Sequence, residues 1–522
     1  MGVTAKPVTP GSGVFLVGAA RAELDPPFRV EVVLVDVPFF VGGRPAPAHP
    51  DDPATMDKFE AARREADECE RVYARMVSKG VTSGADSVAL SDVLDRLAPD
   101  QALVAFAIGA NDTGTDHLGA FVTTGKAKRP VWVSLGSMNE IEQDVEPWLA
   151  SLGSPSTGSS AEENRCRTLG STVRDRLWKP IAARIGDARD VFLVPEGVAE
   201  DIPWLALPES GGQYFADTGT TLRVIEAERD LLNAPAPTRP GNTLLAVGGP
   251  DFDRDAMALT ASASPVPSDV SRAWRCTGSQ SLNLRPLPAA EKEAEDIAGS
   301  WSKHGSSMEL LIRGGATEQA LKKAAPGKTC IHIATHGIVV EDTCSVAFSG
   351  SRGIGGIELI QNVKPKPKRA VSKVQPAKHT NPWLGRQVWL ALAGANRAGD
   401  SQDENEGLLT AEEIVTMDLR GTQWVVLSAC QSALGSGWTR EGVLGMQRSF
   451  HLAGARSVIA SHWSIGDEST REWMNALYAA RRPGKSAGAA VGDACRSVLA
   501  ARRASGRSTH PFYWAAFTAS GE

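Results

Sequence analysis

The segment LSACQSA (residues 427–433) places a cysteine directly after a short apolar run, Trp424–Leu427, which predicts a buried strand. A second predicted strand ends in the same way in IHIATHG (residues 331–337), where a histidine is followed by a glycine. Parallel strands present their carboxyl ends at one edge of a sheet, and ligands bind there. The pattern therefore predicts that His336 and Cys430 meet at that edge, where an imidazole and a thiol would be the base and nucleophile of a cysteine peptidase.

Around these two segments, strand-like and helix-like runs alternate in two blocks. This alternation predicts an α/β fold of two tandem units, each a mostly parallel sheet flanked by helices. The first block has expected strands at 102–108, 131–134, 191–195 and 222–225, and helices at 141–152 and 168–185. The second has expected strands at 244–247, 309–312, 329–334, 388–392, 424–428 and 457–461, and helices at 289–303, 317–325, 410–415, 442–453, 468–480 and 486–504.

The linkers between these blocks give the expected domain boundaries. Residues 1–84 form an accessory segment of short strands and a Gly- and Pro-free helix at 54–79, and another short helix is expected at 90–97. The first α/β unit covers residues 85–233, and a Pro-rich linker separates it from the second unit, residues 241–522. The first unit has no equivalent cysteine and histidine at its strand ends, so the second unit is expected to carry the chemistry.

The bulk composition excludes several classes of protein. The 522 residues are 42% hydrophobic and 22% charged with a net charge of −6, which fits a globular protein and not a nucleic-acid or membrane-surface binder. The seven cysteines are dispersed, without CxxC pairs or a close Cys/His cluster, so neither a disulfide framework nor a metal site is predicted. No signal core and no membrane-spanning run is recognisable, and the expected location is cytoplasmic.

Each candidate residue also has a structural interpretation. A buried cysteine at a strand end is often only a small apolar residue, but Cys430 has Ser and Ala neighbours that leave room for a substrate backbone. His336 precedes Gly337, so its ring is expected at the rim of the sheet; His332, deeper in the same strand, is interpreted as structural. The amides of Gly337 and Cys430 are the candidate donors to the oxyanion of an acyl-transfer intermediate.

Several motifs in order resemble the CHAT peptidase family, which is related to separases and caspases. They are LVPEGVAEDIPWLAL (193–207), IHIATHG (331–337), LALAGANR (390–397), LLTAEEIVTMDL (408–419), VVLSAC (425–430), EGVLGMQRSFHLAGARSVIASHW (441–463) and HPFYWAAF (510–517). Together they suggest a resemblance over roughly residues 95–522. The sequence departs from the family pattern after the cysteine, where Gln431-Ser432-Ala433 replaces Glu-Thr-Gly, and at His462 in the segment Ala460–Trp463.

The resemblance implies an inactive caspase-like half (85–233) followed by an active half (241–522). It also implies a dyad with Cys430 as nucleophile and His336 as base, which cleaves a dedicated protein substrate. No cofactor is required, although calcium stays open because some members of the clan bind it. Relatives act as regulated effectors, often in bacterial defence or cell death. CHAT domains often follow helical repeats in the same chain, whereas residues 54–79 are expected to form one helix and not a repeat array. Control is therefore expected to differ from that of such relatives or to come from a separate sensor or regulatory subunit.

Four residues are candidates for the substrate pocket: Asp467, Ser428, Trp463 and His462. Asp467 lies in WSIGD (463–467), which resembles the separase segment that receives a basic P1 residue, although the residue could equally be a helix N-cap. Ser428 stands where arginine-specific relatives carry an acid, and this difference weakens the case for a basic P1 residue. The basic loop KPKPKR (364–369), continuing to residue 380, could be cut by the enzyme itself or could be only an exposed insert.

Two other classes of protein fit the sequence less well. Gly353–Gly356 is glycine-rich, but it lacks the GxGxxG spacing and a following helix, and no P-loop motif occurs, so nucleotide binding is disfavoured. The other alternative is a catalytically silent CHAT-fold scaffold or regulatory subunit. The presence of both dyad residues favours the enzyme.

Overall fold

A computed structural model describes most of the chain from residue 90 onward. The described ranges are 90–110, 116–153, 159–232, 243–254, 283–302, 306–341, 345–347, 387–400, 407–429, 440–463, 465–481 and 485–521. The expected accessory segment at 1–84, the basic loop at 364–380 and Cys430 lie outside them. Within these ranges, no helix combines the length and the apolar composition needed to cross a bilayer.

An α/β architecture is confirmed, built on one large sheet. Among the described residues this sheet has 11 strands, in the order β3-β2-β1-β4-β5-β15-β14-β13-β8-β6-β7. Their bounds are β1 (Gln101–Ala110), β2 (Asp116–Thr124), β3 (Val131–Ser137), β4 (Asp190–Val194), β5 (Thr221–Val224), β6 (Thr243–Pro250), β7 (Ser307–Arg313), β8 (Cys330–Thr335), β13 (Trp424–Ala429), β14 (Ser457–Ser461) and β15 (Phe517–Ser520). Most neighbouring strands are parallel; β2, β3 and β15 provide the antiparallel pairs.

The expected division into two tandem units, each with its own sheet, is not confirmed. Strands from both expected units belong to the same sheet, where β5 and β15 pair in parallel through Val224 and Ser520. The apolar run at 388–392 is also placed differently from the prediction. It forms β11 (Gln387–Ala391) in a separate antiparallel sheet with β9 (Gly337–Glu341), β10 (Ser345–Ala347) and β12 (Leu408–Leu409).

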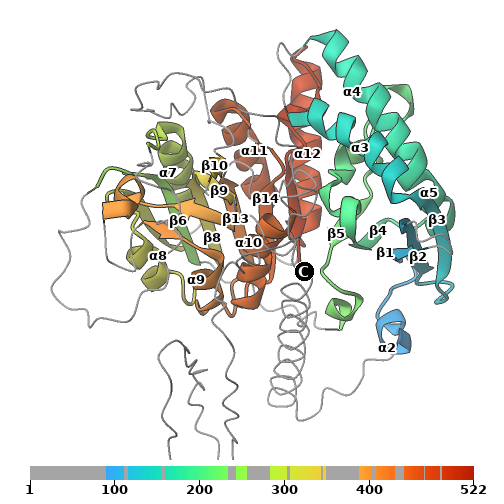
Figure 1. Ribbon diagram of the computed structural model, residues 1–522, viewed down its shortest axis with the longest axis horizontal. Helices are drawn as coiled ribbons and strands as arrows, with labels where there is room; N and C mark the ends of the chain where they lie inside the picture. Colours follow the sequence, from blue (N-terminus) through green and yellow to red (C-terminus); the bar gives the residue numbers. More distant parts are fainter. Residues whose placement is uncertain are drawn as a thin grey trace, which may run out of the picture. The chain divides into compact units, whose positions relative to one another are not determined.

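Helices cover both faces of the large sheet (Figure 1). They are α2 (Leu90–Asp95), α3 (Met138–Gly153), α4 (Ser160–Val173), α5 (Lys179–Ile185), α7 (Pro288–Ser302), α8 (Glu318–Ala324), α9 (Ala411–Val415), α10 (Arg440–Leu452), α11 (Asp467–Ala480) and α12 (Ala487–Ala504). A π-helical segment (Arg174–Trp178) joins α4 to α5, and short 3-10 helices include Ala395–Asp400 and Pro511–Tyr513.

Successive side chains of β13 point to opposite faces of the sheet and pack in two different cores. In β13, Trp424 and Val426 pack in the core that includes residues of α3, α5, α7, α11 and α12. Val425 and Leu427 pack in the core that includes residues of α8, α9 and α10. β13 is therefore buried on both faces, which explains its unbroken apolar sequence. Each fully buried aliphatic side chain contributes roughly 1.5–3 kcal/mol to folding.

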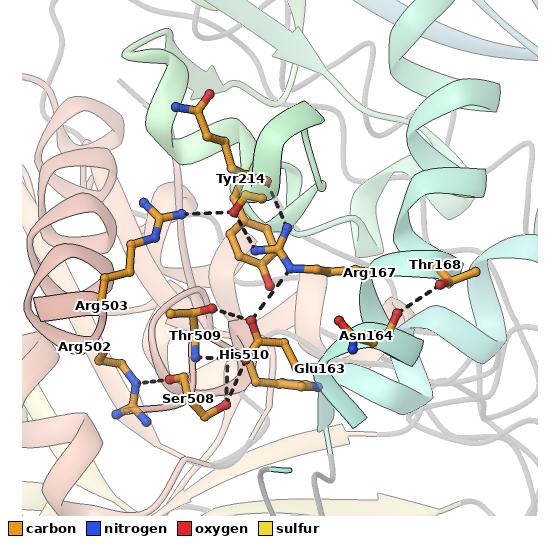
Figure 2. Close-up of polar contacts among 12 residues, drawn as sticks. Glu163, Asn164, Arg167, Thr168, Tyr214, Arg502, Arg503, Ser508, Thr509 and His510 are labelled. Atoms are coloured by element: carbon orange, nitrogen blue, oxygen red, sulfur yellow. Dashed lines mark hydrogen bonds and ion pairs between the residues drawn. The ribbon is translucent and has the colours of Figure 1, made fainter. Parts of the chain in front are cut away.

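A polar cluster centred on Glu163 links α4 to the segment that follows α12. The Glu163 carboxylate accepts hydrogen bonds from the Thr509 amide (3.0 Å), the Ser508 hydroxyl (3.2 Å) and the Thr509 hydroxyl. Figure 2 shows this carboxylate pointing at both residues, with the Arg167 guanidinium on its other side. Arg167 lies 3.7 Å from the carboxylate and stacks on the Tyr214 ring at 3.9 Å. The cluster thus joins parts of the chain that are about 345 residues apart.

Glu163→Gln should lower the free energy of unfolding by about 1.5–3 kcal/mol, because hydrogen bonds to a charged group are worth that much and the side chain is mostly buried. Urea denaturation of both proteins measures the difference. Glu140→Gln is the matched control: its carboxylate, 60% exposed, lies 3.6 Å from Arg176, and such a pair contributes little. Equal losses in the two variants would contradict the assigned role of the Glu163 cluster.

A second buried carboxylate connects α8 to α9. Glu318 is 1% exposed, and the Lys322 ammonium donates to both Glu318 and Glu413. Burial, followed by the neighbouring Glu413 carboxylate, raises the pKa of Glu318 to about 8. The folded chain therefore binds a proton at Glu318 between about pH 4.5 and 8, where the unfolded chain releases it.

Stability should consequently fall as the pH rises through this window, because the folded state holds the extra proton. A shift of one pKa unit corresponds to about 1.4 kcal/mol, so the effect on the free energy of unfolding should exceed that value between pH 5 and pH 8. Glu318→Gln cannot ionise, so its free energy of unfolding should fall less over the same range. Urea titrations of both proteins at pH 5 and pH 8 test this; parallel pH dependences would contradict it.

Candidate active site

Three neighbouring parallel strands end at the same edge of the large sheet. β8 pairs with β13 on one side, where Ala429 is the partner of Thr335, and with β6 on the other, where Gly248 is the partner of Ala334. His336 follows directly after β8. Phe252 follows β6 by two residues, and Cys430 is the residue after the last residue of β13.

His336 is held between these strand ends and is only 5% exposed. Its Nε2 lies 3.0 Å from the backbone carbonyl oxygen of Arg285, just before α7. The Phe252 ring lies against the imidazole, with centroids 5.2 Å apart and planes at 41°. The backbone carbonyl of His336 accepts from the Ala391 amide at 3.0 Å, which ties the residue to the end of β11.

The contact with Arg285 fixes the tautomer of the His336 ring. A carbonyl oxygen can only accept a hydrogen bond, so Nε2 must carry the proton and donate it. In the neutral ring the basic nitrogen is then Nδ1. An imidazole oriented in this way can take a proton at Nδ1 while the carbonyl stabilises the charged ring through Nε2–H.

Three of the seven cysteines lie in the described part of the chain, and all three are buried. Burial raises the pKa of Cys166 to about 11 and that of Cys495 to about 12, and it also raises the pKa of Cys330. Protonated thiols are poor nucleophiles, so these three cysteines are structural. Cys330 is therefore a core thiol, whereas Cys344 lies outside the described residues.

His332 lies deeper in β8, as expected for the competing histidine. It is fully buried, with Nδ1 3.1 Å from the Tyr478 hydroxyl and Nε2 3.0 Å from the Glu293 carboxylate. The Tyr478 hydroxyl also lies 3.9 Å from the Cys330 sulfur. These contacts join β8 to α7 and α11 inside the core, which supports the structural interpretation of His332.

The candidate pocket residues lie along β13 and at the end of β14. Ser428, His462 and Trp463 are buried, at 1–3% exposure. His462 Nε2 lies 2.5 Å from the Thr518 hydroxyl, and burial lowers its pKa to about 4, so the ring is neutral at physiological pH. Trp463 Nε1–H donates to the Phe512 carbonyl at 3.1 Å. His462 and Trp463 therefore hold β15 and the preceding turn, and a pocket role for these residues stays a prediction.

Two further predicted positions lie at element boundaries. α11 begins at Asp467 and has Gly466 as its N-cap, so the alternative role of Asp467 as the N-cap is wrong by one position. Gly337 is the first residue of β9 and pairs with Leu390 of β11. Its amide, like that of Cys430, stays a predicted oxyanion donor.

Sequence reasoning did not identify Phe252, Arg285 or Asn396 as parts of this site. Arg285 contributes a backbone carbonyl, so its side chain carries no signal of this role. Asn396 lies in the quoted LALAGANR motif. The motif does not indicate that its side-chain oxygen accepts a hydrogen bond from the amide of Leu284, the residue before Arg285. Among the described residues, no cluster of three or more His, Cys, Asp or Glu side chains could hold a metal ion.

The sequence model of the CHAT domain family matches residues 167–522. Among curated proteins, mouse tetratricopeptide repeat protein 28 is 26% identical over 343 residues, and its human counterpart is 25% identical over 342 residues. These matches cover 64% of this chain but only 12% of each relative.

Among solved structures, the Saccharomyces cerevisiae separase–securin complex aligns with a TM-score of 0.43 and 10% identity over 83% of this chain and 30% of the other. The Arg-specific cysteine proteinase gingipain R aligns with a TM-score of 0.34 and 9% identity over 74% of this chain and 75% of the other. Both likenesses are too distant to assign a residue or an activity.

Proposed function

This chain belongs to the CHAT domain family, and we propose that it is a cysteine endopeptidase in which Cys430 is the nucleophile and His336 is the base. The observation that carries the proposal is the pairing of Ala429 with Thr335. The proposed nucleophile and base are the next residues in the sequence after these partners, which belong to adjacent parallel strands. The tautomer of His336, with Nδ1 as the basic nitrogen, supports the same assignment.

The proposed reaction is acyl transfer. His336 Nδ1 takes the proton of the Cys430 thiol, and the sulfur attacks the carbonyl carbon of the scissile peptide bond. The amides of Gly337 and Cys430 stabilise the oxyanion, and the imidazolium then protonates the leaving amine as the C–N bond breaks. Water hydrolyses the resulting thioester, with His336 again as base, and the thiol is restored. The Arg285 carbonyl stabilises the imidazolium in both steps.

We assign this chemistry to residues 241–522 and a non-catalytic, supporting role to residues 85–233. The substrate is proposed to be a specific protein, with turnover controlled by a separate sensor or regulatory subunit, as for an effector of bacterial defence. Terminal proteomics tests the proposal: candidate proteomes are incubated with wild type or Cys430→Ala, and new N-termini are mapped. Termini that appear only with wild type are expected. If no such termini appear with any candidate proteome, including proteomes that contain the proposed sensor or regulatory subunit, the result would favour the alternative of a catalytically silent CHAT-fold scaffold.

Asp467 is proposed to select a basic P1 residue, because it stands at the start of the helix that follows β14 at the same sheet edge. Asp467→Asn should lower kcat/KM about 10- to 100-fold for peptides with P1 Arg or Lys, the effect of losing one charge-assisted hydrogen bond of about 1.5–3 kcal/mol. A fluorogenic panel with P1 Arg, Lys, Leu and Asp measures it. Cleavage after Leu or Asp and none after Arg would refute this preference.

A further inference from the structure

Asn396 connects two segments that are far apart in the sequence. Its side-chain oxygen accepts from the Leu284 amide at 2.6 Å, and its Nδ2 donates to the Leu284 carbonyl at 3.1 Å. The same Nδ2 donates to the Asp253 carboxylate at 2.8 Å. The Asn396 backbone amide donates to the Phe252 carbonyl at 2.9 Å. One residue therefore fixes the backbone of Leu284 in both directions, together with the turn that follows β6.

The two segments held by Asn396 supply the Arg285 carbonyl and the Phe252 ring, which contact the His336 imidazole. Leu284 directly precedes Arg285, whose carbonyl oxygen receives the His336 Nε2–H. Phe252 directly precedes Asp253 and lies against the His336 ring. The segment 283–287 leading into α7 is not part of a strand, so no β-ladder fixes the carbonyl groups of Leu284 and Arg285.

We propose that Asn396 is a positioning residue: through Leu284 and Phe252 it sets the distance and direction of the Arg285 carbonyl and the Phe252 ring, and thereby the tautomer and orientation of His336. This inference rests on the proposed function, since it assigns a role in the same reaction. A purely structural Asn396 would stabilise the loop without altering the imidazole.

Asn396→Ala should lower kcat about 100-fold with little change in KM, because a misplacement of about 1 Å in a catalytic group can cause a loss of this size. Asn164→Ala is the matched control, since Asn164 is an exposed residue of α4 remote from the sheet edge. Should N396A fail to fold, N396D keeps the acceptor for the Leu284 amide but loses both donated bonds. The double variant N396D/D253N restores the bond to residue 253 with donor and acceptor exchanged, and it should recover part of kcat.

The direct readout is the protonation of the His336 ring, measured by NMR on protein labelled with ¹⁵N-histidine and assigned with His336→Gln. Wild type should carry the proton on Nε2, and N396A should show a mixture of tautomers. Ring shifts in N396A identical to those of wild type, or an unchanged kcat in a folded variant, would overturn the proposal. If wild type cuts no substrate through Cys430, the proposed function fails, while the ring tautomer still decides the role of Asn396.

Discussion

Cys430→Ala should reduce peptide-bond cleavage by about 10⁵-fold or more, to the background rate, because none of the three described thiols is placed to replace the nucleophile. Cys166, Cys330 and Cys495 are buried with raised pKa values. The measurement is hydrolysis of a peptide that spans a site mapped by terminal proteomics. Residual activity within tenfold of wild type would contradict the assignment of Cys430.

The control for this variant is Cys495→Ala. Cys495 is a fully buried residue of α12, so its replacement should cost stability through the lost contacts while leaving kcat unchanged. Thermal unfolding of both variants shows whether a loss of activity reflects chemistry or folding. Cys430→Ala should unfold at a temperature close to that of wild type, and a large fall there would make its inactivity uninformative about the nucleophile.

His336→Gln should lower kcat by about 10²- to 10⁴-fold, the range that a positioned acid–base group contributes. Glutamine can still donate to the Arg285 carbonyl, so the local fold is kept while the proton acceptor is lost. Alkylation of Cys430 by iodoacetamide near pH 7 should also slow, because the neighbouring imidazolium no longer stabilises the thiolate. Peptide mapping assigns the alkylated residue.

His332→Gln is the matched control for the base. Its ring lies in the same strand but contacts the Tyr478 hydroxyl and the Glu293 carboxylate inside the core. The variant should lose about 1–3 kcal/mol of stability through buried polar groups left without their partner, with the same kcat and the same alkylation rate as wild type. Comparable losses of kcat in the two histidine variants would remove the distinction between base and core residue.

Much of the large sheet could be predicted from local sequence. The strands β6, β8, β13 and β14 are short apolar runs bounded by polar or small residues, and their predicted positions agree with the structure, apart from small differences at the ends. The helix at 486–504 can also be predicted from the sequence, because its apolar residues recur at helical spacing and Ser486 caps its N-terminus.

The predicted strand pairing differs from the structure where the paired strands lie far apart in the sequence. β15 is only four residues long, and its pairing with β14 and β5 makes a single sheet from strands that were expected to form two. β11 has the same apolar character as a buried parallel strand, but it pairs antiparallel with β9 in the small sheet. Apolar content indicates a strand without indicating its partner.

The candidate site shows the same difference between local features and long-range contacts. The position of a cysteine and a histidine after apolar strands follows from the sequence, because residue type and strand ends are both local features. The Arg285 backbone carbonyl contacts the His336 ring, 51 positions away in the sequence. The Asn396 side-chain amide contacts the backbone of Leu284, 112 positions away. No residue pattern marks such contacts, so only the folded chain shows that Arg285 contacts His336 and that Asn396 holds the neighbouring Leu284.

We propose that the Cys430 sulfur and the His336 imidazole act as nucleophile and base where neighbouring strands end. The most direct measurement is a crystal structure of the chain trapped with a peptide that carries a thiol-reactive group at P1. We expect a covalent bond to Cys430 Sγ, with His336 Nδ1 within about 4 Å of that sulfur and Nε2 bonded to the Arg285 carbonyl. A bond to another cysteine, or an imidazole turned away from the trapped sulfur, would contradict it.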